Sequence, residues 1–313
     1  MEKFEVKKAM TRPINRKLVL RENKYFLMFA GIAIIGFLLF YLYPIIRTLI
    51  LSFTNKGFGP YYDYVGFENY IYALSKDKLF GAAIGKSLIF AFISGTLVLV
   101  TSLMLAMLLN SKVKGIGVFR TIYFLPFIIP SFAVGAVYKN IFNPSNGVVN
   151  ALLRLFGVAE EELPLWYAGP DTALATMIII SSFGFGVKML VFLAALQGIP
   201  KHYYEVADIE GASKARQFFK ITLPMISPMT FFNIILITID GLKAFSLAFV
   251  MGNGNGWPAN STLLFPIYMF TTAFSDFKMG YAAAMAWLFF LLILALTGIH
   301  FLISRFYVQK DLY

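Results

Sequence analysis

Cysteine is absent from this 313-residue sequence, and there are only two histidines. Without cysteine the chain can form no disulfide, no thiolate metal site and no cysteine nucleophile. The two histidines, His202 and His300, lie far apart in the sequence, so we expect no metal site. No cluster of residue types suggests a catalytic centre, and we therefore expect no enzymatic activity in this chain.

Charge is also scarce, whereas apolar side chains are abundant. Charged residues make up 14% of the sequence and hydrophobic residues 59%, including 34 phenylalanines. Soluble domains contain about 25% charged and roughly 45–50% apolar residues, and one of this size could not bury such a surplus. The surplus must face lipid. The net charge of +11 does not indicate nucleic-acid binding, because the basic residues gather in short segments between apolar runs.

Six apolar segments are long enough to cross a bilayer as helices, which takes about 20 residues. They lie at roughly 25–53, 84–110, 118–142, 172–198, 225–250 and 281–307. The first is too long for a signal peptide, and the third should bend at Pro126 and Pro130. A further stretch, 263–274, is too short to span and is expected at the outer interface. The sequence thus predicts an all-α integral membrane protein with six transmembrane helices.

Lysine and arginine in the short loops set the orientation. Seventeen of them lie on the side of the N-terminus and five on the other side, and eight of the seventeen precede Tyr25. Both termini are therefore expected in the cytoplasm. Residues 1–24 would form a basic cytoplasmic arm and residues 25–313 a multi-pass transmembrane domain.

The most informative segment is the loop 199–224 between the fourth and fifth predicted spans. Pro200 can end one helix and Pro224 can open the next. The residues between them are amphipathic and too polar to enter the bilayer, and Gly211 either breaks a helix or allows close approach of another backbone. We expect a short cytoplasmic helix-turn-helix, stiffly joined to two spans, that can transmit force from a soluble partner. An ordinary surface loop would not explain the paired prolines.

This loop resembles the EAA loop of binding-protein-dependent ABC importers, in which Glu-Ala-Ala precedes an acidic-Gly-Ala triplet and a later Ile-x-Leu-Pro. The matching residues are Glu205, Ala207, Glu210, Gly211, Ala212, Ile221, Leu223 and Pro224. Val206 departs from the pattern by replacing an alanine, and Glu210 by replacing the usual aspartate. Segments 119–131, 196–200 and 280–284 also resemble carbohydrate permeases of the maltose-permease type. The resemblance covers nearly the whole chain from Tyr41 onward.

The resemblance implies a permease subunit that pairs with a second, homologous subunit, in a heterodimer, and binds two cytoplasmic ATPase subunits. The loop 199–224 would contain a coupling helix inserted into a groove of an ATPase, with Glu205 facing a basic residue there. An extracellular or periplasmic binding protein would deliver a sugar or oligosaccharide. The ATPase subunits would bind ATP and magnesium, and this chain would hold no cofactor. Its place would be the cytoplasmic membrane of a prokaryote.

Ionisable residues within the predicted spans indicate a solute pathway, because such residues usually face a cavity or a partner. Lys188 lies in the fourth span, and Asp240 and Lys243 lie in the fifth. Since Asp240 and Lys243 are three residues apart, they either neutralise each other on one helix face or line the cavity. The resemblance implies solute contacts at about Phe127, Ser131, Gly184, Asp240 and Lys243.

Aromatic side chains with polar neighbours suit a sugar ring, whereas two lysines would suit an acidic sugar or a phosphorylated polyol. The alternative function is therefore an importer of the same architecture for glycerol phosphate or another small organic solute. A secondary transporter is less favoured, because neither internal repeats nor an ion-coupling arrangement of carboxylates is apparent. The glycine-rich turn 251–258 either contacts the binding protein, gates the outer mouth or is a plain flexible turn.

Overall fold

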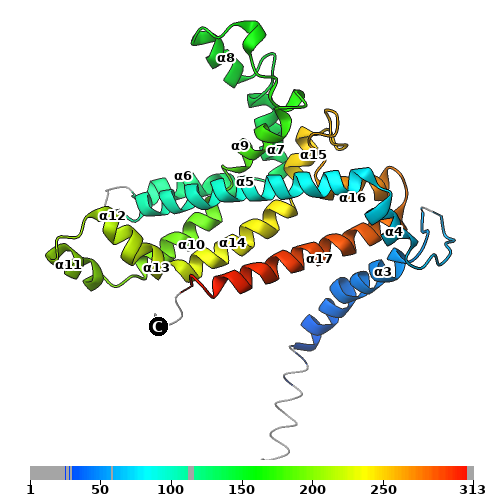
Figure 1. Cartoon of the computed structure of the whole chain (residues 1–313), viewed down its shortest axis with the longest axis horizontal. Coiled ribbons are helices and arrows are strands. Elements are labelled where there is room, and N and C mark those ends of the chain that lie inside the picture. The colour runs from blue at the N-terminus through cyan, green and yellow to red at the C-terminus, as the bar shows by residue number, and fades with distance from the viewer. Residues whose placement is uncertain (1–24, 26–27, 29, 58, 112–115, 309–313) are drawn as a thin grey trace, which may run out of the picture.

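The structure, a computed structural model, describes residues 25, 28, 30–57, 59–111 and 116–308. This part of the chain is helical, and its only β pairing is an isolated bridge between Thr54 and Tyr64. Long helices run side by side, and shorter helices leave them at an angle (Figure 1). The basic arm expected at residues 1–24 lies outside the described residues.

The elements follow in this order. The first span ends with the π-helical turn η1 (Leu38–Leu42) and α3 (Tyr43–Ser52), and α4 (Glu68–Ser75) leads to the long α5 (Lys78–Leu109). Next come α6 (Ile116–Ile128), α7 (Ser131–Ile141), α8 (Val148–Leu155), η2 (Glu160–Glu162), η3 (Trp166–Ala168), α9 (Ala173–Ser181) and α10 (Gly186–Gln197). The loop 199–224 and the residue after it hold α11 (His202–Ile209), α12 (Lys214–Gln217), η4 (Phe218–Thr222) and α13 (Leu223–Met225). The chain continues through α14 (Ser227–Leu242), α15 (Ser246–Met251), α16 (Phe265–Phe274) and α17 (Met279–Ser304).

Four helices are long and apolar enough to cross a membrane: Ala30–Ser52, Lys78–Leu109, Ser227–Met251 and Met279–Ser304. The pair α9 and α10, bent by 40°, forms a fifth span if it is taken as one. This confirms an all-α membrane architecture. The count of six is not confirmed, because the third predicted span is divided into α6 and α7, and neither half qualifies by length.

Three helices are interrupted by non-helical residues. The first break falls at Ile129 and Pro130, where proline removes a backbone donor and clashes with the preceding turn. Helix α6 runs through Pro126, so the expected interruption occurs at the second proline. The other breaks are Ser182–Phe185, between α9 and α10, and Lys243–Phe245, between α14 and α15.

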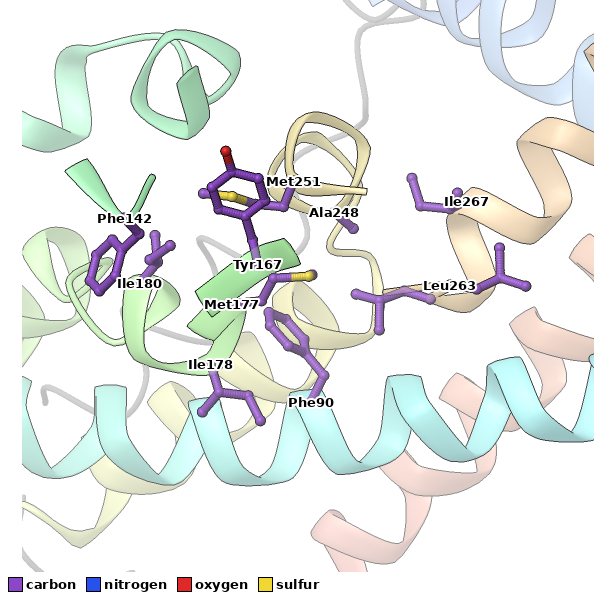
Figure 2. Close-up of a cluster of buried hydrophobic side chains, with 11 residues drawn as sticks. Phe90, Phe142, Tyr167, Met177, Ile178, Ile180, Ala248, Met251, Leu263 and Ile267 are labelled. Carbon is purple, nitrogen blue, oxygen red and sulfur yellow. The ribbon is translucent and has the colours of Figure 1, made fainter. Parts of the chain in front are cut away.

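Two hydrophobic clusters pack on either side of these breaks. The first cluster, shown in Figure 2, joins α5 to α9, α15, α16 and the loop before α9 through side chains such as Phe90, Met177 and Met251. The second cluster joins the other half of α5 to α10 through Leu109, Phe192 and their neighbours. The three helix breaks therefore lie between two hydrophobic clusters that pack separately.

Asp77 joins three helices at the end of the bundle where α5 begins. Its carboxylate caps α5 by accepting hydrogen bonds from the backbone N–H groups of Leu79 and Phe80, at 2.9 and 3.2 Å. It also accepts from the hydroxyl groups of Tyr268 on α16 and Tyr281 on α17. One side chain thus holds three helices in register. The short helix α16 packs against α5 and α17.

Candidate solute cavity and coupling loop

The three helix breaks face a cavity of about 830 Å³. This volume falls within the range of small-molecule sites, roughly 300–1,000 Å³. Residues at or beside each break line it, including Ile129 and Ser131 at the first, Phe183 at the second and Phe245 at the third. The lining combines aliphatic side chains with aromatic rings, serine hydroxyl groups and glycines.

Four of the six residues expected in the solute pathway line this cavity: Ser131, Gly184, Lys188 and Asp240. Phe127 lies near the end of α6, two residues before the cavity residue Ile129. Lys243 caps the C-terminus of α14, is exposed and does not belong to the cavity lining. Four of the expected residues thus lie at the cavity and Lys243 lies outside it, whereas the side chain of Phe127 is outside the described part of the structure.

The charged pair in the cavity joins two different helices. Lys188 Nζ on α10 lies 2.6 Å from Asp240 Oδ2 on α14, and the exposed fractions of the two side chains are 12% and 62%. Of the two alternatives for Asp240, a pair with Lys243 on its own helix or a place in the cavity lining, the structure shows the second, and the partner of Asp240 is Lys188 from α10. The Lys188 side chain is thus mostly shielded from solvent, whereas the Asp240 side chain is exposed and accessible to a solute.

Small residues let α5 and α14 cross closely beside the cavity. A Cβ atom at Gly241 would lie 2.8 Å from Ala91 Cα, and one at Gly95 would lie 2.7 Å from Ile237 Cγ2. Close approach through small residues is a common way for membrane helices to pack. Sequence reasoning missed both glycines as cavity residues, although glycine within a long apolar run is a signal that could have indicated them.

The loop 199–224, which we predict to be the coupling loop, forms the expected helix-turn-helix. Helix α11 ends in a Schellman motif, in which the Ala212 N–H donates to Ala207 O at 2.8 Å and the Gly211 N–H donates to Asp208 O at 3.1 Å. Gly211 has a φ of +73°, a left-handed conformation that glycine adopts without strain. A Cβ atom there would meet nothing within 4 Å in this chain. Gly211 therefore ends the helix, and the alternative of close backbone packing within the chain does not apply.

Asp208 organises the turn that follows. Its Oδ1 accepts hydrogen bonds from Lys214 Nζ at 2.8 Å and from the buried amide of Gln217 at 2.6 Å. The hydrogen bond from Lys214, followed by that from Gln217, lowers the pKa of Asp208 below its ordinary value. Ser213 caps α12 by accepting from the Arg216 N–H at 3.3 Å. None of these polar contacts was predicted from the sequence, because the residues that make them are not part of the EAA-loop motif.

The residues of the predicted coupling motif fall into two groups. Glu205, Glu210 and Gly211 are exposed, whereas Ala207 is buried and the others are partly buried: Ala212, Ile221, Leu223 and Pro224. An apolar row also lies on the outside of α11, where Tyr203, Val206 and Ile209 are 42%, 53% and 86% exposed. These three residues follow at intervals of three and so share one face of the helix.

The glycine-rich turn 251–258 is tied to α7. Lys139 Nζ donates to Val250 O at 2.7 Å and to Asn253 Oδ1 at 2.6 Å, and it lies 5.5 Å from the centre of the Tyr167 ring. The first residues of the turn are thus held against α7. Its role in contacting another protein or gating the mouth stays a prediction.

Comparisons with known proteins agree with this arrangement. Residues 98–309 match the family described as "Binding-protein-dependent transport system inner membrane component". The chain is 38% identical to the probable ABC transporter permease protein YesP of Bacillus subtilis, with 89% of each chain covered. It is 32% identical to the lactose transport system permease protein LacF of Rhizobium radiobacter, over 90% of this chain and 94% of that protein.

A solved structure shares the fold. It is that of a bacterial alginate ABC transporter in complex with a periplasmic protein bound to an alginate pentasaccharide, and one of its chains superposes with a TM-score of 0.80 at 21% identity. The match covers 94% of this chain and 98% of that chain. The protein therefore belongs to the family of inner-membrane permease components of binding-protein-dependent ABC transport systems.

Proposed function

We propose that this chain, paired with a second permease subunit, forms the pathway by which an ATP-driven importer carries a sugar or oligosaccharide across the cytoplasmic membrane. One observation carries the proposal. The cavity at the three helix breaks is bordered by α10 and α14, and the exposed coupling loop connects these same two helices. The proposed solute site and the proposed docking site for an ATPase subunit thus lie on the same two helices and the loop between them.

The chemistry of the cavity supports a saccharide. Sugar rings stack their C–H faces on aromatic side chains, and their hydroxyl groups need hydrogen-bond partners. The lining offers the rings of Tyr123, Tyr138, Phe183 and Phe245, the hydroxyl groups of Ser131, Ser181 and Ser246, and the carboxylate of Asp240. Relatives named for the transport of lactose and of diacetylchitobiose point to the same class of solute.

The alternative solute, glycerol phosphate or another anion, has less support from the charges. Among the described residues, Lys188 is the one cation of the cavity lining, and its ammonium group already binds Asp240. The member of the pair that is open to a solute is the carboxylate, at 62% exposed. An ionised carboxylate accepts hydrogen bonds and repels a phosphate. A neutral sugar fits this surface better.

Separate ATPase subunits would supply the energy through the coupling loop. The exposed row Tyr203, Val206 and Ile209 gives α11 an apolar surface for a groove on a soluble partner, and Glu205 lies beside it. In this scheme Glu205 faces a basic residue of the ATPase. Closure of the two ATPase subunits around ATP and magnesium would move the coupling loops together, and hydrolysis would return them.

A second permease subunit would cover the first span. None of the most apolar stretch of Ala30–Ser52 is buried within this chain. In Figure 1 this helix meets α17 near α4 and then diverges from it. An apolar helix whose side chains are left exposed in this way gains packing by lying against a partner in the membrane. A homologous subunit in a heterodimer, fed by an extracellular binding protein, completes the proposed assembly, with both termini of this chain in the cytoplasm.

The proposal is tested by reconstituting the complete transporter in liposomes. We expect labelled neutral disaccharides to enter only with Mg-ATP inside and the binding protein outside, and glycerol 3-phosphate not to compete. Uptake by this chain without ATPase subunits would contradict the importer mechanism. Competition by glycerol 3-phosphate at equal concentration would contradict the saccharide.

A further inference from the structure

The two arms of the coupling hairpin are fastened together at the loop end. We use "coupling hairpin" for α10, the coupling loop and α14. The hydroxyl groups of Tyr204 and Thr222 lie 2.8 Å apart across the loop. Ile199 and Ile226, at the ends of the arms, are both buried in the second hydrophobic cluster, which joins α5 to α10. This end of the hairpin therefore behaves as one packed unit.

The same arms are fastened again at the cavity. Lys188 Nζ binds Asp240 Oδ2 at 2.6 Å, and Asn233 Nδ2 donates to the Lys188 carbonyl oxygen at 3.3 Å. Lys188 lies nine residues before the end of α10 at Gln197, which is about 14 Å along a helix. The two fastenings thus lie at opposite ends of the hairpin.

The ion pair lies close to the last point at which both arms are helical. Helix α10 begins at Gly186, two residues before Lys188, and α14 ends at Leu242, two residues after Asp240. Beyond these ends lie the breaks that line the cavity. If the arms were not held together here, their free ends would be able to separate when the loop moves.

We infer that Lys188 and Asp240 are a positioning pair that holds the cavity ends of the coupling hairpin together, so that both arms move as one when the coupling loop moves. The inference rests on the proposed function and deepens it. Lys188 is largely shielded from solvent, at 12% exposed, which limits the competition from water for its ammonium group. Asp240 Oδ1 has no partner among the described residues, so a solute hydroxyl group can bind there without displacing Lys188.

The absence of cysteine from the chain makes the test direct, because introduced thiols are the only ones in this subunit. Leu190 on α10 and Phe232 on α14 are both exposed, at 37% and 48%. With Leu190→Cys and Phe232→Cys carrying spin labels, the distance between the arms is measured in the complete transporter. The measurement is made without nucleotide and after trapping with Mg-ATP and orthovanadate, so no saccharide is required.

We expect one narrow distance distribution, with the same mean in both states, when the ion pair is intact. Lys188→Met and Asp240→Asn should each broaden or shift this distribution in the trapped state. Lys188→Arg, which keeps a donor, should retain it. Thr238→Val is the matched control, because it removes a polar contact of the same arm to His300 on α17 and should leave the distribution unchanged.

Three results would overturn the inference. In the first, Lys188→Met and Asp240→Asn keep the narrow distribution in both states. In the second, the distance changes on trapping even with the pair intact, because the arms then do not move as one. In the third, Thr238→Val has the same effect as loss of the ion pair. The proposed function is judged separately, since a wild-type complex that traps nucleotide but imports no saccharide contradicts that function and not the distance result.

Discussion

Replacing Gly211 by valine should separate ATP hydrolysis from solute uptake while the subunit still inserts into the membrane. Gly211 ends α11 with a φ of +73°, a conformation that side chains with a branched Cβ rarely adopt. The Schellman motif at this residue fixes the direction in which the chain leaves the coupling helix. Valine there should disturb the surface that the ATPase subunit meets.

The magnitude follows from the local geometry. A Cβ atom at Gly211 meets nothing within 4 Å, so the cost is backbone strain rather than a clash. For an L-residue the left-handed conformation costs about 1–2 kcal/mol. A penalty of that size lowers the population of the native turn by about 5–30-fold. The rest of the bundle should be unaffected, because no side chain packs against this position.

The assay compares Gly211→Val with Gly211→Asn in the reconstituted complex. Asparagine tolerates the left-handed conformation better than other residues, so it should keep most of the ATP-driven uptake, whereas valine should lose most of it. The amount of subunit in the membrane and its thermal midpoint in detergent should be similar for both variants. Equal uptake by the two variants would refute the reasoning, because the conformation of Gly211 would then be unimportant for coupling.

Three further predictions concern the same machinery. Glu205→Lys should abolish uptake and weaken co-purification of the ATPase subunits, whereas Glu205→Gln should retain part of both; equal retention by the two would contradict the assigned contact. Because the folded-state pKa of Asp208 is lowered, its contribution to the turn is complete above its unfolded pKa of about 3.9 and is lost as the pH falls through the folded value. The protection factors of the amides at residues 207–217, which compare measured hydrogen exchange with the intrinsic rate at the same pH, should therefore fall below about pH 4 and be constant from pH 5 to 8, and Asp208→Asn should abolish this acid response. Gly241→Val should destabilise the subunit by about 1–3 kcal/mol through overpacking, seen as a lower thermal midpoint, since its Cβ would press on the backbone of Ala91 at 2.8 Å.

Much of the fold and of the coupling loop could be predicted because their signals are local. Long apolar runs indicate membrane-spanning helices whatever residues flank them. Pro200, Gly211 and Pro224 indicate where helices begin and end in the loop, and these signals depend on only a few adjacent residues. The interruption at Pro130 follows from the same rules. The number of spans was harder to predict from the sequence, because two of the predicted spans are broken at the cavity into helices that are each too short to cross a membrane.

The solute site was harder to predict because its contacts join distant parts of the chain. Lys188 and Asp240 are 52 residues apart, and nothing in either local segment indicates that they meet. Local spacing allowed Lys243 as a partner of Asp240, but the packing of α10 on α14 places Lys188 beside Asp240 instead. The close crossing at Gly241 likewise depends on Ala91 of α5, so it becomes visible only in the folded chain.

The central claim is that movement of the coupling loop drives a solute through the cavity of this chain. The most direct measurement is ATP-driven uptake of a labelled disaccharide by the complete transporter in liposomes, with wild-type chain and with Glu205→Lys. We expect uptake that requires Mg-ATP and the binding protein, and none with Glu205→Lys. Equal uptake by Glu205→Lys, or uptake by the permease without its ATPase subunits, would contradict the account.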